Sequence, residues 1–558
     1  MKDDINAAIE SSGYKNPSPF FDEYLMRKFG PELGPQMVSV FGCGPPGTNC
    51  HDQIGRYTVA TQWVCSTLYA FKQSYGPENP MNVFYPVEFA EPNCNDDDGN
   101  KTKVCHGAEG GWVRGNKYSK SDFGKWTAKA YGEFYRNGVI PTDKDYSLST
   151  WEELNYNDIN QISESRWGAF GVRQADCAVL DKLQEAFDWY NWGITEGHED
   201  SMNEVSTSNT WDQAPDEAED ESEDKPEDEL EDESDEEPVP EPNPSGIPLA
   251  DPTLPDYNNL DYTFTCEDSD EVENKFQKCT LSVQSDPPMT FYGRARNGYV
   301  QFAPIPYAEP PVGDLRWKAP VLKTSYDAPV DGHLGGKDQD GNQLMCTQSK
   351  GGQEDCLFLN IEVRQEVLEN KQKVPILYYI HGGGFTSGSG MGTIGKAAEN
   401  QGVVAIGVNY RLGPWGFLYL NEKEDDQDWQ GNWGYLDQQA ALKWVHTYVY
   451  LFGGDKDRVT IAGWSAGAGS VFAHMTLPSS WPYFQKAAAM GGGIWGRQDR
   501  PENRTETASV FFDGAGCTLN DLVCMRDKSA TDIFKASKER EMHKHSIALN
   551  LSNPGNSF

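Results

Sequence analysis

The stretch from Arg458 to Met475 reads RVTIAGWSAGAGSVFAHM, and it constrains the fold more than any other part of the sequence. A short apolar run, typical of a buried strand, leads into Gly463-Trp464-Ser465-Ala466-Gly467, and a helical pattern follows. Glycines around a serine let strand and helix approach closely, and the tight turn lifts the serine out of the sheet. Ser465 is therefore a candidate nucleophile, and the amide of Ala466, at the helix N-terminus, can face a developing oxyanion.

The segments around this turn alternate between strand and helix patterns. Continuous apolar runs at Val374–Ile380 and Val403–Tyr410 suit parallel strands that are buried on both faces. Gly434–Val449 has helical spacing, and "FQKAAAMGG" after the serine turn predicts one more strand. This order predicts an α/β fold of the α/β-hydrolase type, with a mostly parallel central sheet.

A glycine-rich loop directly follows the first of these strands, with the sequence His381-Gly382-Gly383-Gly384. Glycines in such a loop let backbone N–H groups approach the carbonyl oxygen of a substrate. Gly383 and Gly384 are therefore predicted to complete an oxyanion hole with Ala466.

Composition divides the 558 residues into three zones and excludes some classes of partner. Between Asp216 and Glu237 there are 16 acidic residues and one basic residue, which explains much of the net charge of −39. We predict a disordered acidic linker over residues 195–258. It lies between a folded part at 1–194, the first zone or zone one, and a folded part at 259–558, zone three. So acidic a chain is not expected to bind nucleic acid or an anionic membrane surface.

The twelve cysteines indicate disulfides and an oxidising compartment, outside the cell or in the secretory pathway. Ten of them form close pairs, which are Cys43/Cys50, Cys94/Cys105, Cys266/Cys279, Cys346/Cys356 and Cys517/Cys524. The alternative of a zinc site lacks matching C-x-x-C pairs. Three glycosylation sequons, at Asn100, Asn503 and Asn550, agree with secretion.

Two further features bear on localisation. The start MKDDINAAIE has no basic and apolar signal-peptide pattern, which conflicts with secretory cysteines and suggests that Met1 is not the natural beginning. No apolar stretch is long enough to predict a membrane span.

From about residue 290 onward the chain resembles the type-B carboxylesterase/cholinesterase family of α/β hydrolases. The resemblance rests on the motifs APIPYAEPPVGDLRWKAP, EDCLFLNI, HGGGF, NYRLGPWGFL, GNWGYLDQQAALKWV and FGGDKDRVTIAGWSAGAGSV, which occur in the family's order. It implies Ser465 as the nucleophile and Gly383, Gly384 and Ala466 as oxyanion donors. It also implies ion pairs Arg316–Glu354 and Arg411–Asp437, and disulfides Cys346–Cys356 and Cys517–Cys524.

Two departures from the family pattern bear on the substrate. Trp464 stands where the family usually has a glutamate before the serine. The loop between Cys346 and Cys356, which carries a choline-binding tryptophan in cholinesterases, holds only TQSKGGQED. It offers no aromatic ring for a cation–π contact, so a choline ester is not expected.

The general base is not predicted to lie after the serine, where the family would place it. His474 lies in the helix after Ser465 and is read as a packing residue, and His543 and His545 are read as surface residues. Instead KVCHGAEGG, around His106, resembles the H-G-x-E stretch of the family's catalytic histidine. The segments before and after this histidine also resemble the family's helices and strands at these places, and the resemblance implies a Cys65–Cys177 disulfide. Zone one therefore resembles the C-terminal third of an esterase.

The acid is predicted from position alone. The family's acid turn precedes the helix that resembles Ser18–Gly30, which leaves Asp4, with Asp3 as an alternate, while a true acid absent from the chain is equally favoured. By the same resemblance, a segment of roughly 30 residues between the end of zone three and the start of zone one is missing.

Two arrangements remain open at this point. The chain is an out-of-phase piece of a tandem esterase, or its two parts assemble as a permuted domain across a linker whose reach is near 50 Å at roughly 5–6 Å × √n. The predicted function is a cofactor-free serine hydrolase of a small-molecule carboxylic ester. The alternatives are a catalytically incomplete fragment and a non-catalytic adhesion or binding protein. CNDDDGNKT and KDQDGNQ lack the last ligand of a calcium loop and are read as turns, so no metal is predicted, and the oligomeric state is left open.

Overall fold

A computed structural model gives the fold of the chain. It describes residues 249–538 except for short gaps, the longest being 269–275, 419–430 and 493–500, and small pieces of the first zone at 22, 35, 38–39, 94–95, 101–103, 131 and 133–137. The predictions for His106, Asp3, Asp4, His543 and His545 lie outside the described residues, as does most of the predicted linker.

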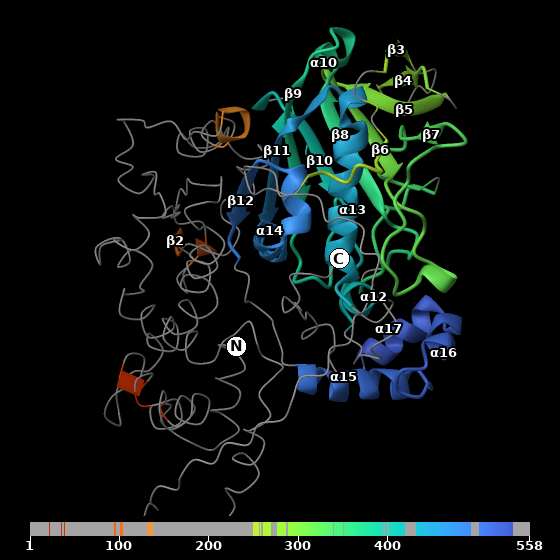
Figure 1. Ribbon diagram of the computed structural model, residues 1–558, viewed down its shortest axis with the longest axis vertical. Coiled ribbons are helices and arrows are strands. Elements are labelled where there is room, and N and C mark those ends of the chain that lie inside the picture. The colour runs from red at the N-terminus through yellow and green to blue at the C-terminus, as the bar shows by residue number, and fades with distance from the viewer. Residues whose placement is uncertain are drawn as a thin grey trace, which may run out of the picture.

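One large mixed sheet organises zone three (Figure 1). Its strands run in the spatial order β12-β11-β9-β10-β8-β6-β5-β4-β3, with the short β7 beside β5. The antiparallel side contains β3 (Tyr262–Asp268), β4 (Gln277–Val283), β5 (Met289–Arg296), β6 (Tyr299–Pro306) and β8 (Phe358–Arg364), and the short β7 (Val330–Asp331) pairs in parallel with β5. In the first zone, β1 (Cys94–Asn95) and β2 (Lys101–Lys103) form a small antiparallel pair.

The other side of the sheet is parallel and contains the strands predicted from apolar runs. It consists of β9 (Val374–Ile380), β10 (Val404–Val408), β11 (Gly454–Trp464) and β12 (Lys486–Met490). β9 pairs in parallel with β10 and β11, and β11 with β12, while β10 meets β8 antiparallel. The α/β prediction is therefore confirmed, and its parallel core carries an added antiparallel side.

The helices follow the strands as the alternating pattern predicts. They are α10 (Gln365–Glu369), α12 (Gly413–Phe417), α13 (Trp433–Tyr448), α14 (Ala466–Thr476), α15 (Pro501–Gly514), α16 (Leu522–Asp527) and α17 (Ala530–Lys538). Short 3-10 turns lie at Gly313–Leu315, Val449–Phe452 and Pro478–Tyr483. Figure 1 shows α15, α16 and α17 grouped away from the main sheet, where they share a smaller apolar cluster with Trp317 and Trp433.

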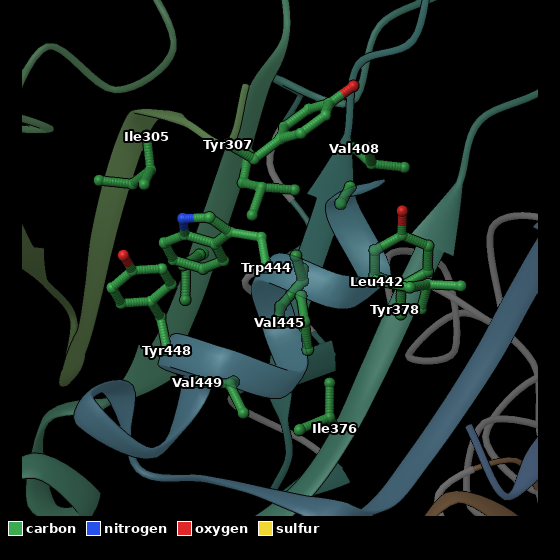
Figure 2. Close-up of a cluster of buried hydrophobic side chains, with 14 of the residues drawn as sticks. Ile305, Tyr307, Ile376, Tyr378, Val408, Leu442, Trp444, Val445, Tyr448 and Val449 are labelled. Atoms are coloured by element: carbon green, nitrogen blue, oxygen red, sulfur yellow. The ribbon is translucent and has the colours of Figure 1, made fainter. Parts of the chain in front are cut away.

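The main core lies between α13 and the sheet (Figure 2). Trp444 and Tyr448 on α13 stack with their ring centroids 4.9 Å apart, and Trp444 donates its indole N–H to the Tyr326 hydroxyl at 2.7 Å. The helix was predicted from one apolar face, but nearly every position of it is buried. The reason is that α13 also contacts α12, α14 and the turn at Pro478–Tyr483.

Two buried ion pairs confirm the predicted partners and fix loops onto the core. Arg411 binds Asp437 through Nε and Nη2 at 2.9 and 2.7 Å, and its backbone N–H donates to the same carboxylate. Arg316 binds Glu354 with two hydrogen bonds of 2.7 and 2.6 Å. Its remaining nitrogen, Nη1, donates to three backbone carbonyls at residues 525, 526 and 528, so this arginine ties α16 to the sheet domain.

Three predicted disulfides are present. Cys266–Cys279 joins the adjacent strands β3 and β4, Cys346–Cys356 closes a short loop, and Cys517–Cys524 fixes the start of α16. The other three predicted pairs involve cysteines of the first zone, and the structure does not describe these bonds.

The predicted linker boundary at residue 258 stays a prediction, although some residues before it have defined contacts. Ala250, Leu254 and Tyr257 pack against the main core. The backbone N–H of Asp251 donates to the Tyr483 hydroxyl at 3.1 Å. The acidic segment therefore reaches the folded part by residue 249. Within the described part of the chain, no helix is both long and apolar enough to cross a bilayer.

Asp437 offers a test of the buried ion pair. Replacing Asp437 with Ala leaves the Arg411 guanidinium buried without its counter-charge, because both side chains are at most 4 % exposed. We expect the free energy of unfolding of the full chain to fall by about 3–5 kcal/mol, measured by urea denaturation. The matched control is Asp261→Ala, which breaks the exposed pair with Lys371 and should leave the midpoint nearly unchanged. Equal midpoint shifts for both variants would contradict this account.

Candidate active site

Ser465 occupies the sharp turn between β11 and α14. Its backbone adopts φ 59° and ψ −120°, a conformation that non-glycine residues rarely take. The Ser465 N–H donates to the Met490 carbonyl at 2.9 Å, and its carbonyl accepts from Gly469 at 3.1 Å. These bonds hold the strained residue at the carboxyl end of the parallel strands, with its side chain only half-buried.

The glycines of the G-x-S-x-G motif are required by space. A Cβ on Gly463 would lie 2.2 Å from the Gly467 carbonyl oxygen, and one on Gly467 would lie 2.1 Å from the Ile380 carbonyl oxygen. A Cβ on Gly492, which follows β12, would lie 2.2 Å from the backbone carbonyl oxygen of Ser465. Strand, helix and neighbouring strands therefore cross at a separation that no side chain permits, as the sequence analysis predicted.

The glycine-rich loop after β9 lies against this turn. A Cβ on Gly382 would lie 2.4 Å from the Trp464 carbonyl oxygen and 3.0 Å from the Ser465 Cβ. Gly383 and Gly384 both have positive φ, at 121° and 63°. The structure thus places Gly382 against the serine turn, and the predicted donors Gly383 and Gly384 follow it directly in the loop.

His381 sets the direction of the first donor amide. Its Nδ1 lies 2.8 Å from the Gly382 carbonyl oxygen, and burial lowers its pKa to about 4, so the ring is neutral and Nδ1–H is the donor. Because C=O and N–H point in opposite directions in a trans peptide, fixing this carbonyl turns the Gly383 N–H away from His381. Tyr410 holds the ring in place by stacking at 4.4 Å, and its hydroxyl donates to the His381 carbonyl.

The second donor amide is oriented by the next turn. The Gly383 carbonyl accepts the backbone N–H groups of Thr386 and Ser387 at 3.2 and 3.1 Å, and the Ser387 hydroxyl at 3.0 Å. The Gly384 N–H must therefore point away from this turn. The hydrogen bonds at the Gly382 and Gly383 carbonyls therefore fix the orientation of the two peptide groups that carry the predicted donor N–H groups.

Gln348 links the short disulfide loop to the glycine-rich loop. Its side-chain amide donates to the Gly388 carbonyl at 2.8 Å and accepts the Gly388 N–H at 3.0 Å. It also donates to the Cys346 carbonyl at 3.0 Å. The Cys346–Cys356 loop therefore supports the loop that carries Gly383 and Gly384. This role was missed by the sequence analysis, because nothing in TQSKGGQED marks Gln348 as different from its polar neighbours.

A buried hydrogen-bonded network lies behind the nucleophile, in α13 and α14. His474 is fully buried, with Nε2 at 3.1 Å from Gln438 Oε1 and Nδ1 at 3.0 Å from Ser480 Oγ. Gln438 Oε1 can only accept, so Nε2 carries the proton and Nδ1 accepts from Ser480. Gln438 Nε2 then donates to Ser470, which donates to the Ala466 carbonyl at 3.2 Å. His474 was predicted to be a packing residue, and it is one with a fully paired ring.

The described residues hold no cluster of three or more His, Cys, Asp and Glu side chains suited to a metal ion. The predicted base His106 and acid Asp4 lie outside these residues, so their distance to Ser465 stays a prediction.

The close crossing at Gly467 can be tested by adding one methyl group. Gly467→Ala would push a Cβ to 2.1 Å from the Ile380 carbonyl oxygen, and backbone rather than a flexible side chain would have to move. We expect the variant to lose at least about 2 kcal/mol of stability, seen as a lower melting temperature. Gly392→Ala is the control, since its Cβ would meet no atom within 4 Å, and it should melt like the unaltered chain. A stable Gly467→Ala variant would refute the steric argument.

The buried His474 ring should make the free energy of unfolding depend on pH. Burial lowers the pKa of His474 to about 3, well below the value near 6.5 of an unfolded histidine. Below about pH 6.5 the unfolded state therefore binds a proton that the folded state does not, and stability falls with acidification by about 1.4 kcal/mol per pH unit. In His474→Gln, urea denaturation between pH 7 and 5 should show a smaller loss of stability. An unchanged slope would exclude His474 as its source.

Comparisons with known proteins find carboxylesterases. The sequence model described as "Carboxylesterase family" matches residues 290–554. The chain is 35% identical over 254 residues to the para-nitrobenzyl esterase of Bacillus subtilis (strain 168), which covers 44% of this chain and 50% of that protein. It is 37% identical over 260 residues to the juvenile hormone esterase of Tribolium castaneum, covering 44% and 43%.

Among solved structures, a carboxylesterase of Geobacillus stearothermophilus is 31% identical, with a TM-score of 0.42 over 46% of this chain and 54% of that one. The chain thus spans about half the length of the relatives it matches. The matched residues 290–554 include both the glycine-rich loop and the serine turn. The part of the chain that holds the candidate site is therefore similar to the carboxylesterase family.

Proposed function

We propose that this protein hydrolyses a carboxylic ester through an acyl-enzyme intermediate on Ser465. The observation that carries the proposal is the contact between the glycine-rich loop and the serine turn, which places Ser465 beside the backbone of Gly382. A nucleophile and an oxyanion hole are both needed for acyl transfer, and here they are built from adjacent segments.

The reaction begins with proton transfer and attack. His106 accepts the Ser465 hydroxyl proton as the serine oxygen bonds to the ester carbonyl carbon. The carbonyl oxygen becomes an oxyanion, which the N–H groups of Gly383, Gly384 and Ala466 stabilise. The tetrahedral intermediate collapses with loss of the alcohol, which takes the proton from His106.

Water completes the reaction. His106 accepts a proton from a water molecule, whose oxygen attacks the acyl-serine carbonyl, and the same oxyanion donors stabilise the second intermediate. Collapse releases the carboxylic acid and returns the proton to Ser465. Asp4, with Asp3 as the alternate, is the proposed acid that orients His106. No metal or organic cofactor takes part in these steps.

The substrate is proposed to be an uncharged small ester. The Cys346–Cys356 loop is short and its residues include no aromatic ring, so it offers no cation–π site. Trp464, next to the nucleophile, is partly buried and packs against the apolar cluster on the sheet. An indole at this position replaces the negative charge that the family resemblance would predict, which disfavours cationic substrates.

The protein is proposed to work in the secretory pathway or outside the cell. Three disulfides are present in the described part of the chain, and such bonds persist in oxidising compartments. Glycosylation at Asn100, Asn503 and Asn550 is part of the same proposal.

Labelling with a fluorophosphonate tests the mechanism. The full chain, produced in a secretory host, should be labelled at Ser465 and should hydrolyse p-nitrophenyl butyrate. Ser465→Ala should remove labelling, and His106→Ala should reduce its rate by roughly 10³-fold or more, because the hydroxyl loses its base. Initial labelling rates measured by gel fluorescence give both values.

Ser529→Ala is the control, because Ser529 caps the distant helix α17 and should not affect labelling. Labelling that survives in His106→Ala would assign the base to another residue. A folded chain that is never labelled would sink the esterase proposal, and an incomplete esterase or a binding protein would replace it.

A further inference from the structure

A short piece of the first zone lies against the sheet of zone three. We call residues 131 and 133–137 the docked segment. They are helical, and Figure 1 shows them in orange next to β9 and β11. Tyr131 and Tyr135 share one apolar cluster with residues of four parallel strands, and Phe134 packs on its margin. Segments more than 240 positions apart in the sequence therefore form one core.

The contacted face of the sheet is the one that α13 and α14 do not cover. Along β9, Ile376, Tyr378 and Ile380 point into the main core, while Leu377 and Tyr379 belong to the cluster with the docked segment. This alternation is that of a strand buried on both faces. A parallel sheet needs cover on both sides, and on this side the described cover is Ile394, Ala397, Ala398 and the docked segment.

Tyr135 is the centre of the contact. Its side chain is 0 % exposed, and its cluster includes Ala405 and Ala462, whose small side chains leave room for the ring. The Tyr135 hydroxyl has no hydrogen-bond partner among the described residues. The ring therefore fits by shape and apolar contact rather than by a polar bond at its tip.

Two hydrogen bonds fix the segment at its edges. Lys486, the first residue of β12, donates a hydrogen bond from its ammonium group to the Tyr135 carbonyl at 2.7 Å. Arg136 donates to the Gln401 carbonyl at 2.5 Å and also pairs with Glu133. The buried Tyr135 ring and the two hydrogen bonds beside it define a specific packing interface between the docked segment and the sheet.

We infer that the docked segment is a permanent cover of this sheet within one chain, so that zones one and three fold as a single unit in reversed order. The sequence predicts a flexible linker from residue 195 onward, and the 54 residues from 195 to 248 would span roughly 40 Å. Tethering raises the effective concentration into the millimolar range, which favours the same chain over a second copy. The inference deepens the proposed function, because His106 belongs to the same zone as the docked segment.

Cleavage of the folded full chain tests the inference. None of the disulfides predicted or present joins zone one to zone three, so a protease site inserted between Asp216 and Glu237 would leave only non-covalent contacts between them. The uncut protein should be a monomer by light scattering. After cleavage, both fragments should co-elute at the mass of the intact chain down to nanomolar concentration. Separation after cleavage, or a dimer before it, would overturn the inference.

Two substitutions at one position sharpen the test. Tyr135→Ala removes the buried ring, and association of the cleaved fragments should weaken roughly 100-fold or more. Tyr135→Phe is the matched control, because it removes only the unpaired hydroxyl and should keep the association. If Tyr135→Ala does not fold, Lys486→Met keeps the apolar stem, loses the bond to the Tyr135 carbonyl, and should weaken association several-fold. Equal association in all variants would contradict the assigned contact.

The readout is independent of catalysis. Stable association without fluorophosphonate labelling would refute the esterase proposal and leave this inference standing. Labelling of the Ser465 fragment after the fragments have separated would refute this inference and leave the nucleophilic role of Ser465 standing.

Discussion

Two glycines fix the distance between β11 and α14, and the geometry of Ser465 depends on that distance. A side chain at Gly463 would clash with the Gly467 carbonyl oxygen. Because none is present, the chain reverses at the single residue Ser465, whose backbone takes up the strain. The same contact brings the end of β9 beside the turn, because the missing Cβ of Gly467 faces the Ile380 carbonyl. The glycine-rich loop begins at the next residue, so the same close packing positions both the candidate nucleophile and the loop of the candidate oxyanion donors.

Neutral buried polar groups keep this arrangement rigid. His381 and His474 both have pKa values lowered by burial, to about 4 and about 3, and each ring is bound at a backbone or side-chain oxygen. A neutral imidazole has one donor and one acceptor, so each ring specifies the direction of its neighbours. In one case it orients a carbonyl of the glycine-rich loop, and in the other it joins α13 to α14. The charged pair Arg411–Asp437 fixes the loop that precedes α12.

The fold was readable where local pattern and burial agree. The apolar runs at Val374–Ile380 and before Ser465 predicted strands, and the G-x-S-x-G spacing predicted the turn, because sterics there leave few alternatives. The family resemblance supplied the buried ion pairs, which no periodicity reveals, while close cysteine spacing supplied the disulfides and the resemblance agreed for Cys346–Cys356 and Cys517–Cys524. Gln348 and the direction of each amide were not predictable, because they depend on which carbonyl a side chain reaches in three dimensions. The antiparallel strands β3 to β6 and β8 were also not predicted, because the alternation of strand and helix patterns indicates only the parallel strands.

The contact between Lys486 and Tyr135 joins residues 351 positions apart, and this separation has a consequence for biosynthesis. At about 5–20 residues per second, a ribosome needs roughly 20 to 70 seconds to make the chain between them. During that time the apolar ring of Tyr135 has no sheet to cover. Because contacts so distant in sequence form late, Tyr135 stays without its partner strands until β9 to β12 have been synthesised. The core around Tyr135 therefore completes only after β12 has been made, which makes its folding slower than that of a core built from neighbouring segments.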